Sequence, residues 1–549
     1  MSERVETLLK NGDRLFSKRD SLHSLWQEIA DHFYPEREGF TVTRNIGDEF
    51  ASHLVTSFPV LVRRDLGNSL SSMLRPTGKE WFHMRAAREN IEDNAAKRWL
   101  EYASGVQRRA MYDTDAQFVK ATKQADHDFA AFGQCVITVE LNKFGNGLLY
   151  RNWHLKDVAW AEGYNGKPET VYRRWKPEAR ILEKHFPGKL HPNAVNKMAK
   201  EPYCEVDCCH IVMPTSEYQS PEGKKWRTPY VSIHVDKDNQ HIMEEVGIYV
   251  HPYVIPRWQT VSGSQYAYSP ATVAALPEAR TIQAMTLTLL EAGEKATNPP
   301  IVAKKDIFRD DFNYYAGGLT YADLEGDQNL SDALQILTND KSGIPFGIDM
   351  RNDQREILKE AFLLNKIFMP PPEKEMTAYE AQLRNQEFIR QTLPLFEPME
   401  QDYNGEVCER TFELLLRGNA FGPIEEIPQS LRNQEVQFRF ESPLHDAIER
   451  GKAQKFSEGM ALMERAMAAD ESAGASFDVP TAFREAMEGL GMPAKWIRPE
   501  EMAQEIILQQ RQEAANQRAT QAQTDQSLAA QESARAAQEA AAAEEALVA

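Results

Sequence analysis

KEMTAYEAQLRNQEF (374–388) lies just after three consecutive prolines at 370–372. Thr377 is placed to act as a helix N-cap and Glu380 to reach back to it, a capping box that satisfies two free backbone amides. Proline runs are stiff and extended and make no internal hydrogen bonds. The stretch therefore predicts a loop leading into a strongly specified helix, although the box alone fits an ordinary surface loop equally well.

Two longer stretches on either side carry patterns of the same kind. SGSQYAYSPATVAALPEARTIQAMTLTLLEAGEKATNPPIV (262–302) has a Gly/Ser-rich turn, an S-P step and a long helical pattern that ends in N-P-P. VQFRFESPLHDAIERGKAQKF (436–456) has an alternating strand, then S-P-L, then a helical pattern. Shorter motifs are LHSLWQEIADHFYPE (22–36), DFAAFGQCVITVE (128–140) with an F-G turn into a strand, and ETVYRRWKPEARILEKHF (169–186).

In this order and at about this spacing, these motifs resemble the head-to-tail connector (portal) proteins of short-tailed, podovirus-type double-stranded DNA phages. Each motif is weak alone, but the ordered set is specific, and the likeness covers about residues 20–460. Tyr379 departs from the pattern, because a second small polar residue is commoner there. This departure affects the packing expected for that helix rather than the assignment.

The resemblance implies an α+β class and a mainly helical portal fold with a mostly antiparallel, β-rich wing domain. The expected divisions are a wing at 1–269 (β-rich at 130–255), a first stem helix at 270–298, a clip at 299–347, a second stem helix at 348–369, a channel (tunnel) loop at 370–376, a channel helix and return to the wing at 377–442, a helical crown at 443–499, and a Gln/Ala-rich barrel or tail at 500–549.

Local patterns agree with this plan without requiring it. Apolar residues at three- and four-residue steps predict a helix over 22–33 that Pro35 closes, and short β-rich runs separated by turns fill 135–253. The segment ELNKFGNGLLY (140–150) predicts a hairpin, and Gly418 is expected as the left-handed residue that ends a helix over 399–417. The two predicted stem helices would also suit an ordinary helical hairpin with a surface excursion.

The resemblance places the loop after the second stem helix at the narrowest point of a central channel. The DNA-channel residues implied in this way are Lys366, Pro370, Pro371, Pro372 and Lys374, and the structural cap of the following helix is Thr377 with Glu380.

Composition limits the classes of function. The 549 residues carry 63 Lys and Arg against 82 Asp and Glu, a net charge of −19, which argues against a sequence-specific DNA binder. Such a charge fits ordinary acidic solubility or a channel that is indifferent to sliding phosphates. Five scattered cysteines predict no disulfide framework and a reducing cytoplasm, and neither a signal peptide nor membrane insertion is expected.

Motifs for catalysis, metals and cofactors are incomplete, so we expect no enzyme, no catalytic residue, no metal site and no cofactor. Gly78 and Lys79 lack the other residues of a phosphate-binding loop. Soft zinc ligands (Cys204, Cys208, Cys209, His210), a calcium loop (Asp236, Asp238) and a two-metal acidic cluster (Asp306, Asp310, Asp311) are each better explained as strand core, turn and solvated loop.

The resemblance implies a subunit of a ring, expected to be a dodecamer, at the portal vertex of the capsid. The implied partners are the major capsid and scaffold proteins, terminase during packaging, tail or adaptor proteins, and double-stranded DNA that passes non-specifically; the implied location is the virion, and the host cytoplasm during assembly. One alternative is a DNA-packaging enzyme, a nuclease or ATPase that uses the acidic clusters and Lys79. Another is a scaffold or internal virion protein, suggested by the Gln/Ala-rich tail.

Overall fold

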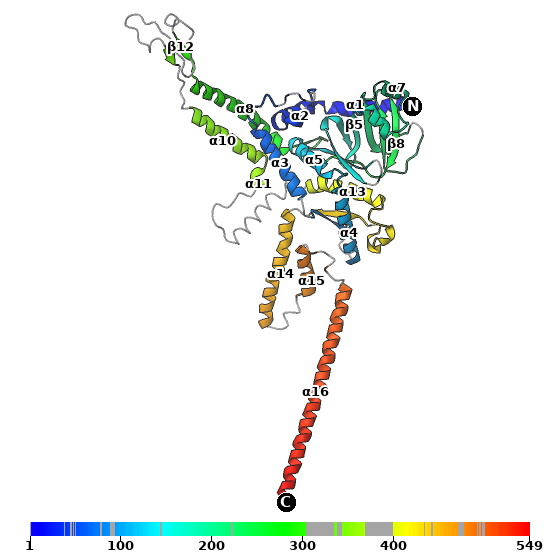
Figure 1. Ribbon diagram of the computed structural model, residues 1–549, viewed down its shortest axis with the longest axis vertical. Coiled ribbons are helices and arrows are strands. Elements are labelled where there is room, and N and C mark those ends of the chain that lie inside the picture. Colours follow the sequence, from blue (N-terminus) through cyan, green and yellow to red (C-terminus); the bar gives the residue numbers. More distant parts are fainter. Residues whose placement is uncertain are drawn as a thin grey trace, which may run out of the picture. The chain divides into compact units, whose positions relative to one another are not determined.

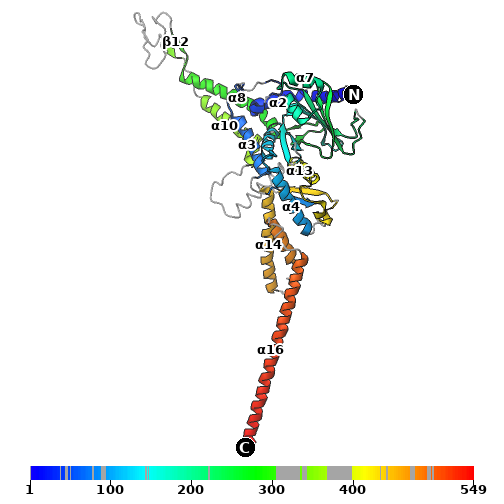
Figure 2. The same cartoon turned by 45° about the vertical axis from the view of Figure 1, so that its right-hand side comes forward.

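The computed structural model forms two compact units, shown together in Figures 1 and 2. The larger unit holds Met1–Phe82, Gly105–Gly422 and Phe440–Leu444, and the smaller holds His83–Ser104, Pro423–Arg439 and His445–Ala549. The residues described are all except 1, 38, 44–46, 48, 50, 77–79, 88–93, 143–144, 146, 221–222, 304–333, 337–342, 368–398, 433, 441–442, 470–476, 491, 493–495, 497–499 and 549.

The larger unit contains two principal antiparallel sheets, and the predicted α+β class is confirmed. The five-stranded sheet follows chain order, and the three-stranded sheet has the order β3-β2-β9. The predicted hairpin is correct, because β2 and β3 pair from Val136↔Trp153 to Leu141↔Leu148. The strands are β2 (Val136–Leu141), β3 (Leu148–Trp153), β4 (Val158–Glu162), β5 (Pro168–Trp175), β6 (Cys208–Pro214), β7 (Tyr230–Asp236), β8 (His241–Ile248) and β9 (Tyr253–Val254), with a small pair β10 (Gln259–Thr260) and β11 (Ala267–Tyr268).

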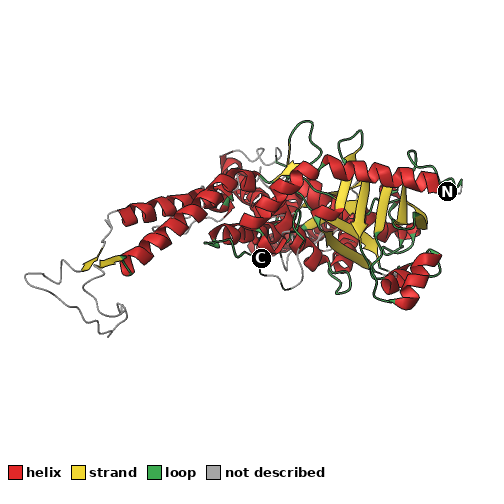
Figure 3. Cartoon of the chain, turned by 90° about the horizontal axis from the view of Figure 1, so that it is seen from above, coloured by secondary structure: helices red, strands yellow, loops and turns green. Residues whose placement is uncertain are grey.

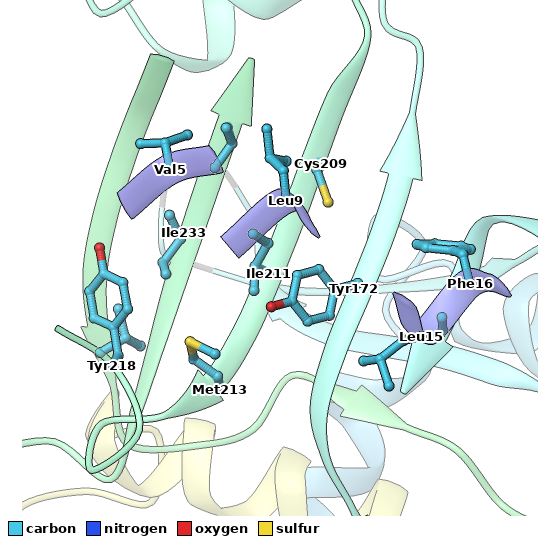
Figure 4. Close-up of a cluster of buried hydrophobic side chains, with 13 residues drawn as sticks. Val5, Leu9, Leu15, Phe16, Tyr172, Cys209, Ile211, Met213, Tyr218 and Ile233 are labelled. Atoms are coloured by element: carbon cyan, nitrogen blue, oxygen red, sulfur yellow. The ribbon is translucent and has the colours of Figure 1, made fainter. Parts of the chain in front are cut away.

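Helix α1 (Ser2–Lys18) covers one face of the five-stranded sheet (Figure 4). Side chains alternate along β6, so Ile211 and its second neighbours meet α1 while the residues between them face the other way. Each large side chain buried in this way contributes roughly 1.5–3 kcal/mol. The buried members of this cluster are Val5, Leu9, Leu15, Phe16, Ala159, Tyr172, Cys209, Ile211, Met213, Tyr218, Val231, Ile233 and Val235.

A bundle of helices accompanies the sheets in the larger unit. The predicted face of α2 (Asp20–Phe33) is correct at Trp26, Ile29 and Phe33, which are all buried, and a short turn begins at Pro35. Among the described residues, no helix has the length and apolar character needed to cross a membrane. The other helices here are α3 (Phe58–Leu74), α5 (Phe118–Phe132), α6 (Ala179–His185), α7 (Pro192–Lys200), α8 (Pro270–Thr297), α10 (Gly343–Ala361), α11 (Leu364–Ile367) and α13 (Glu406–Arg417), and α4 (Asn94–Met111) has residues in both units.

The end of α13 corrects one prediction. The helix ends at Arg417 as expected, but Gly418 has φ −79° and is not left-handed. Asn419 takes the left-handed conformation instead, with φ +53°. Asparagine is the residue after glycine that tolerates this conformation best, so the chain reverses one residue later than the glycine suggested.

The smaller unit is mainly helical. Strand β1 (Phe82–Ala86) pairs with β14 (Val436–Phe440), and α14 (Pro443–Ala469) meets α15 (Val479–Gly489) through Phe456 and Phe483, whose rings are 5.8 Å apart. Helix α16 (Glu500–Val548) is one continuous helix of 49 residues. Its described side chains are exposed or half-buried, so the described part of α16 buries little surface.

Candidate functional site

Two long helices of the larger unit, α8 and α10, lie side by side and are joined through a short antiparallel ribbon (Figures 1 and 3). The ribbon pairs β12 (Ile301–Ala303) with β13 (Leu334–Ile336). Helix α8 has 28 residues and is therefore about 42 Å long. The pair occupies most of the two ranges predicted for stem helices, although α10 begins at Gly343, before the predicted start.

The two helices pack closely at one point and expose apolar side chains elsewhere. A Cβ at Gly347 of α10 would lie 2.8 Å from Leu289 Cδ2 of α8, so a larger residue would require the Leu289 side chain to shift. Few of their other large apolar residues are covered. The exposed ones, with their exposed fractions, are Val273 51%, Leu287 47%, Leu290 55%, Phe346 68%, Ile348 38%, Met350 43% and Ile357 44%.

The start of α8 is fixed by hydrogen bonds to the end of α5. The Ser269 hydroxyl accepts from the Thr272 amide, which makes it the N-cap of α8, and donates to the carbonyl of Ala130 at 2.8 Å. The Thr272 hydroxyl donates to the carbonyl of Ala131 at 2.9 Å. Both hydroxyls are buried, so these bonds fix the direction of α8 where it leaves the end of α5.

The same junction depends on a glycine. Gly133 has φ +71°, and a Cβ there would lie 2.1 Å from the backbone carbon of Tyr268 and 2.3 Å from the nitrogen of Ser269. The neighbouring Gln134 accepts a hydrogen bond from the amide of Ala267 at 2.9 Å. The F-G turn and the S-P step, two motifs more than 130 residues apart, therefore meet in a single backbone contact.

A second brace holds the middle of α8. The Gln283 side chain accepts from the amides of Val55 and Thr56 and donates to the Thr56 carbonyl, all within 2.9 Å. One helical turn away, Arg280 forms an ion pair with Glu28 of α2. The first half of α8 is thus tied to three separate segments of the larger unit.

The end of α10 is anchored by apolar contacts. Leu358 and Phe362 are fully buried, and the Phe362 ring is 5.3 Å from the ring of Phe33 on α2. Leu363 then adopts φ +60°, which is unusual for a branched residue and separates α10 from the short helix α11. Helix α11 packs against α3, so the chain reaches residue 367 from a fixed position.

Of the predicted channel residues, only Lys366 falls within the described part of the chain. The backbone of Lys366 lies in α11. The other residues predicted from sequence lie outside the described residues, namely Pro370, Pro371, Pro372, Lys374, Thr377 and Glu380.

The residues that follow Met399 contact a buried ion pair. Arg75 donates to Asp126 and, at 2.6 Å, to the amide oxygen of Asn404, which lies in a π-helical turn, Glu400–Gly405. The Tyr403 ring lies 4.8 Å from the Arg75 guanidinium carbon. Burial alone lowers the pKa of Arg75, but Asp126 beside it raises that pKa above its ordinary value. Removing one partner of such a pair costs about 3–5 kcal/mol.

The described residues that were considered as metal ligands pack in the core or hold a turn. Cys208 and Cys209 lie in separate apolar clusters on opposite faces of β6, and burial raises the pKa of the Cys209 thiol to about 12. Asp236 accepts from the backbone amide of Asn239 at 3.1 Å and holds a turn. Among the described residues, no three potential ligands form a group. Gly78, Lys79, Asp306, Asp310 and Asp311 lie outside the description.

Residues 5–497 match the family model of the bacteriophage head to tail connecting protein. The chain belongs to this family. The resemblance drawn from its motifs is therefore confirmed.

Relatives and solved structures give the following likenesses. The probable portal protein of Bordetella phage BPP-1 is 23% identical over 457 residues (81% of this chain, 80% of the relative), and the portal protein of Salmonella phage epsilon15 is 22% identical over 543 residues (95% and 93%). Solved chains from the virion of a native gene transfer agent particle and from the neck of an empty one have TM-scores of 0.36 and 0.37 and identities of 10% and 12%. Each covers 80% of this chain and 90% of its own.

The junction at Gly133 predicts a large effect from one methyl group. Gly133→Ala should destabilise the contact between α5 and α8, because the new Cβ meets backbone atoms that cannot rotate away. Gly145→Ala is the matched control, since Gly145 has φ +70° with nothing within 4 Å of its Cβ position. Both changes carry the left-handed cost of about 1–2 kcal/mol, so only the steric part differs.

The measurement is hydrogen exchange in the first turns of α8, together with the thermal unfolding midpoint. We expect Gly133→Ala to lose protection corresponding to at least about 2 kcal/mol more than the control, in the range of severe core substitutions. Equal effects of the two alanines would show that the close approach is not a constraint.

Proposed function

We propose that this chain is the portal subunit of a phage particle, the connector between head and tail. The observation that carries this function is the family match over residues 5–497. It is supported by two relatives, named a probable portal protein and a portal protein, which the chain matches over most of their length. The family and its relatives are connector proteins, so the role of the chain is structural and not enzymatic.

The proposed assembly is a closed ring of identical subunits, expected to be a dodecamer. A ring needs a heterologous contact in which one side of a subunit fits the opposite side of its neighbour. The exposed apolar side chains of α8 and α10 support this, because apolar patches on a surface mark contacts with other molecules. A second copy of the same pair is the occupant we propose, with α8 and α10 as the stem and the ribbon as part of the clip.

The proposed position is the portal vertex of the virion, reached by assembly in the host cytoplasm. There the ring would contact the major capsid and scaffold proteins, terminase during packaging, and then tail or adaptor proteins. Double-stranded DNA would pass through the centre without sequence recognition, which agrees with the net charge of −19.

Purified protein should form closed rings of one dominant size when it is imaged by negative-stain microscopy and sized by light scattering. Leu290→Gln with Phe346→Gln removes one exposed apolar side chain from each helix and should raise the concentration needed for rings at least tenfold, because each buried side chain contributes about 1.5–3 kcal/mol.

The matched control is Ile181→Gln with Val195→Gln, two exposed apolar residues on α6 and α7. It should assemble like the original protein. A monodisperse monomer of the original protein at micromolar concentration would contradict the ring, whereas unchanged rings in the test variant would contradict only the role of this face.

For the channel loop (370–376) we propose weak, mobile phosphate contacts from Lys366 and Lys374, with Thr377 and Glu380 capping the helix that follows. This rests on the sequence and on the anchored end of α10, which precedes the loop in the chain. Lys366→Glu with Lys374→Glu should impair packaging and retention of DNA while rings form normally.

Lys197→Glu with Lys200→Glu makes the same change of charge on α7 and should leave packaging intact. Packaging of a full genome by the Lys366/Lys374 variant would remove the proposed role of these lysines.

For 500–549 we propose a helical barrel formed by neighbouring copies of α16. Small residues recur at heptad spacing, because Ala515, Ala522, Ala529 and Ala536 follow Leu508 at intervals of seven. A stripe with this repeat lets parallel helices approach closely along a left-handed supercoil. An isolated helix gains little stability without a buried face, so the barrel should form only in the ring. Hydrogen exchange on assembled rings tests this, and no protection within 500–520 would contradict it.

A further inference from the structure

An exposed group of basic residues lies where α3 and α5 pack together. Elsewhere in the larger unit many cations pair with carboxylates, as Arg37 does with Asp128 and Lys189 with Glu244. Arg64 on α3 and Lys120 and Lys123 on α5 are exposed, and none has an ion pair among the residues that the structure describes. Three exposed cations without ion pairs among the described residues therefore lie on two helices that pack against each other.

A buried arginine organises this group. Arg63 is only 3% exposed, its Nε donates to the carbonyl of Phe33 at 3.0 Å, and its guanidinium carbon lies 3.8 Å from the centre of the Tyr34 ring. Its remaining nitrogens reach Glu36 at 3.9 Å and His127 at 3.0 Å. Arg63 is thus held rigidly, with one N–H directed at the imidazole of His127.

The contact with Arg63 fixes the tautomer of His127. Arg63 can only donate, so Nδ1 of His127 must accept, and the ring proton is on Nε2. Burial, followed by the charges of Arg63, Lys123 and Arg64, lowers the pKa of His127 to about 4, which keeps the ring neutral. Nε2 makes no hydrogen bond within the described part of the chain, which leaves it as an unused donor.

The imidazole lies in a fixed place against α3. A Cβ at Gly67 would be 2.3 Å from His127 Nδ1, so a larger residue there would displace the ring. Lys123 is one helical turn from His127 on α5, and the fields of both Lys123 and Arg64 act on the ring. The half-buried His127 and the exposed Lys123 and Arg64 therefore lie near one another where α3 and α5 pack together.

We propose that Arg64, Lys123 and His127 form an anion cradle that binds backbone phosphates of double-stranded DNA. The inference rests on the proposed connector function, in which DNA is the polyanion that the protein meets. Cations and N–H donors on helices are the groups that contact phosphates without reading sequence. Helix α3 also packs against α10 and α11, so the cradle belongs to the same packed group of helices from which the predicted channel loop leaves.

Carboxylates lie near the proposed cradle, and they limit it to Arg64, Lys123 and His127. Asp126 and Asp128 on α5 are neutralised by Arg75 and Arg37, and Glu36 lies beside Arg63. Lys120 shares a hollow of about 490 Å³ with the exposed Asp113, so it lies at the margin. The half-buried Asp65 follows Arg64 on α3 and points about 100° away around the helix.

The test measures binding of a fluorescent duplex of about 20 base pairs to the full-length protein by anisotropy, over a range of salt concentrations. Each phosphate contact contributes about 0.9 to the slope of log affinity against log salt. Arg64→Gln with Lys123→Gln should therefore reduce the slope by roughly 1.8 and lower the affinity at 0.1 M salt at least tenfold. Arg64→Lys with Lys123→Arg keeps both charges and should keep the slope.

The matched control is Lys197→Gln with Lys200→Gln, which removes two exposed lysines from α7 and should leave the slope unchanged. An unchanged slope in the Arg64/Lys123 variant overturns the proposal. So does saturable binding of inorganic phosphate without duplex binding, which would assign the cradle to a free anion. Altered ring size with unaltered duplex binding would assign it to a neighbouring copy and also overturn it.

The two proposals can fail separately. A monomer that binds duplex through these residues would contradict the ring and keep the cradle. Normal rings with an unchanged salt slope would keep the connector function and remove the cradle.

Discussion

The close approach of Gly133 to the backbone of Tyr268 and Ser269 is the constraint on which the long helical pair depends. It forces the end of α5 against the start of α8, and the buried hydroxyls of Ser269 and Thr272 then fix the direction of α8. Because a helix is nearly rigid, a small rotation at its first turn becomes a large displacement about 42 Å away. The position of the ribbon at the far end is therefore set at this junction.

A second set of contacts fixes the described chain on either side of residues 368–398. Phe362 against Phe33 fixes the end of α10, and Arg75 with Asn404 fixes the chain soon after it returns. One anchor is apolar and the other is a buried ion pair with Asp126, which tolerates little rearrangement because an unpaired buried charge is costly.

The sequence predicts local elements well where local signals are strong. The β2–β3 hairpin and the start of α8 at Pro270 follow from turn residues and from the S-P step. The early start of α10 could not be predicted, because GIPFGID (343–349) has two glycines and a proline that disfavour a helix. Gly347 lies against Leu289 of α8, a contact that exists only once the two helices are packed.

In the candidate site, too, the sequence does not reveal contacts between residues that are far apart in the chain. The F-G turn and the S-P step are each visible as motifs, but nothing in either indicates that they touch. The pairing of Arg75 with Asp126 and Asn404 is hidden for the same reason, since polar residues inside helical patterns normally face water. Sequence periodicity reports which face of an element is buried and not which distant element buries it.

Net charge conceals local electrostatics in a similar way. Residues 500–549 hold nine acidic residues against three arginines, so a large share of the acidic excess lies on α16. Arg64 and Lys123 stay exposed without carboxylate partners among the described residues, while His127 adds a donor and no charge. A few such contacts against an acidic background give an attraction that salt easily weakens. DNA held only by the proposed contacts would still slide, because none of them would be strong enough to stop it.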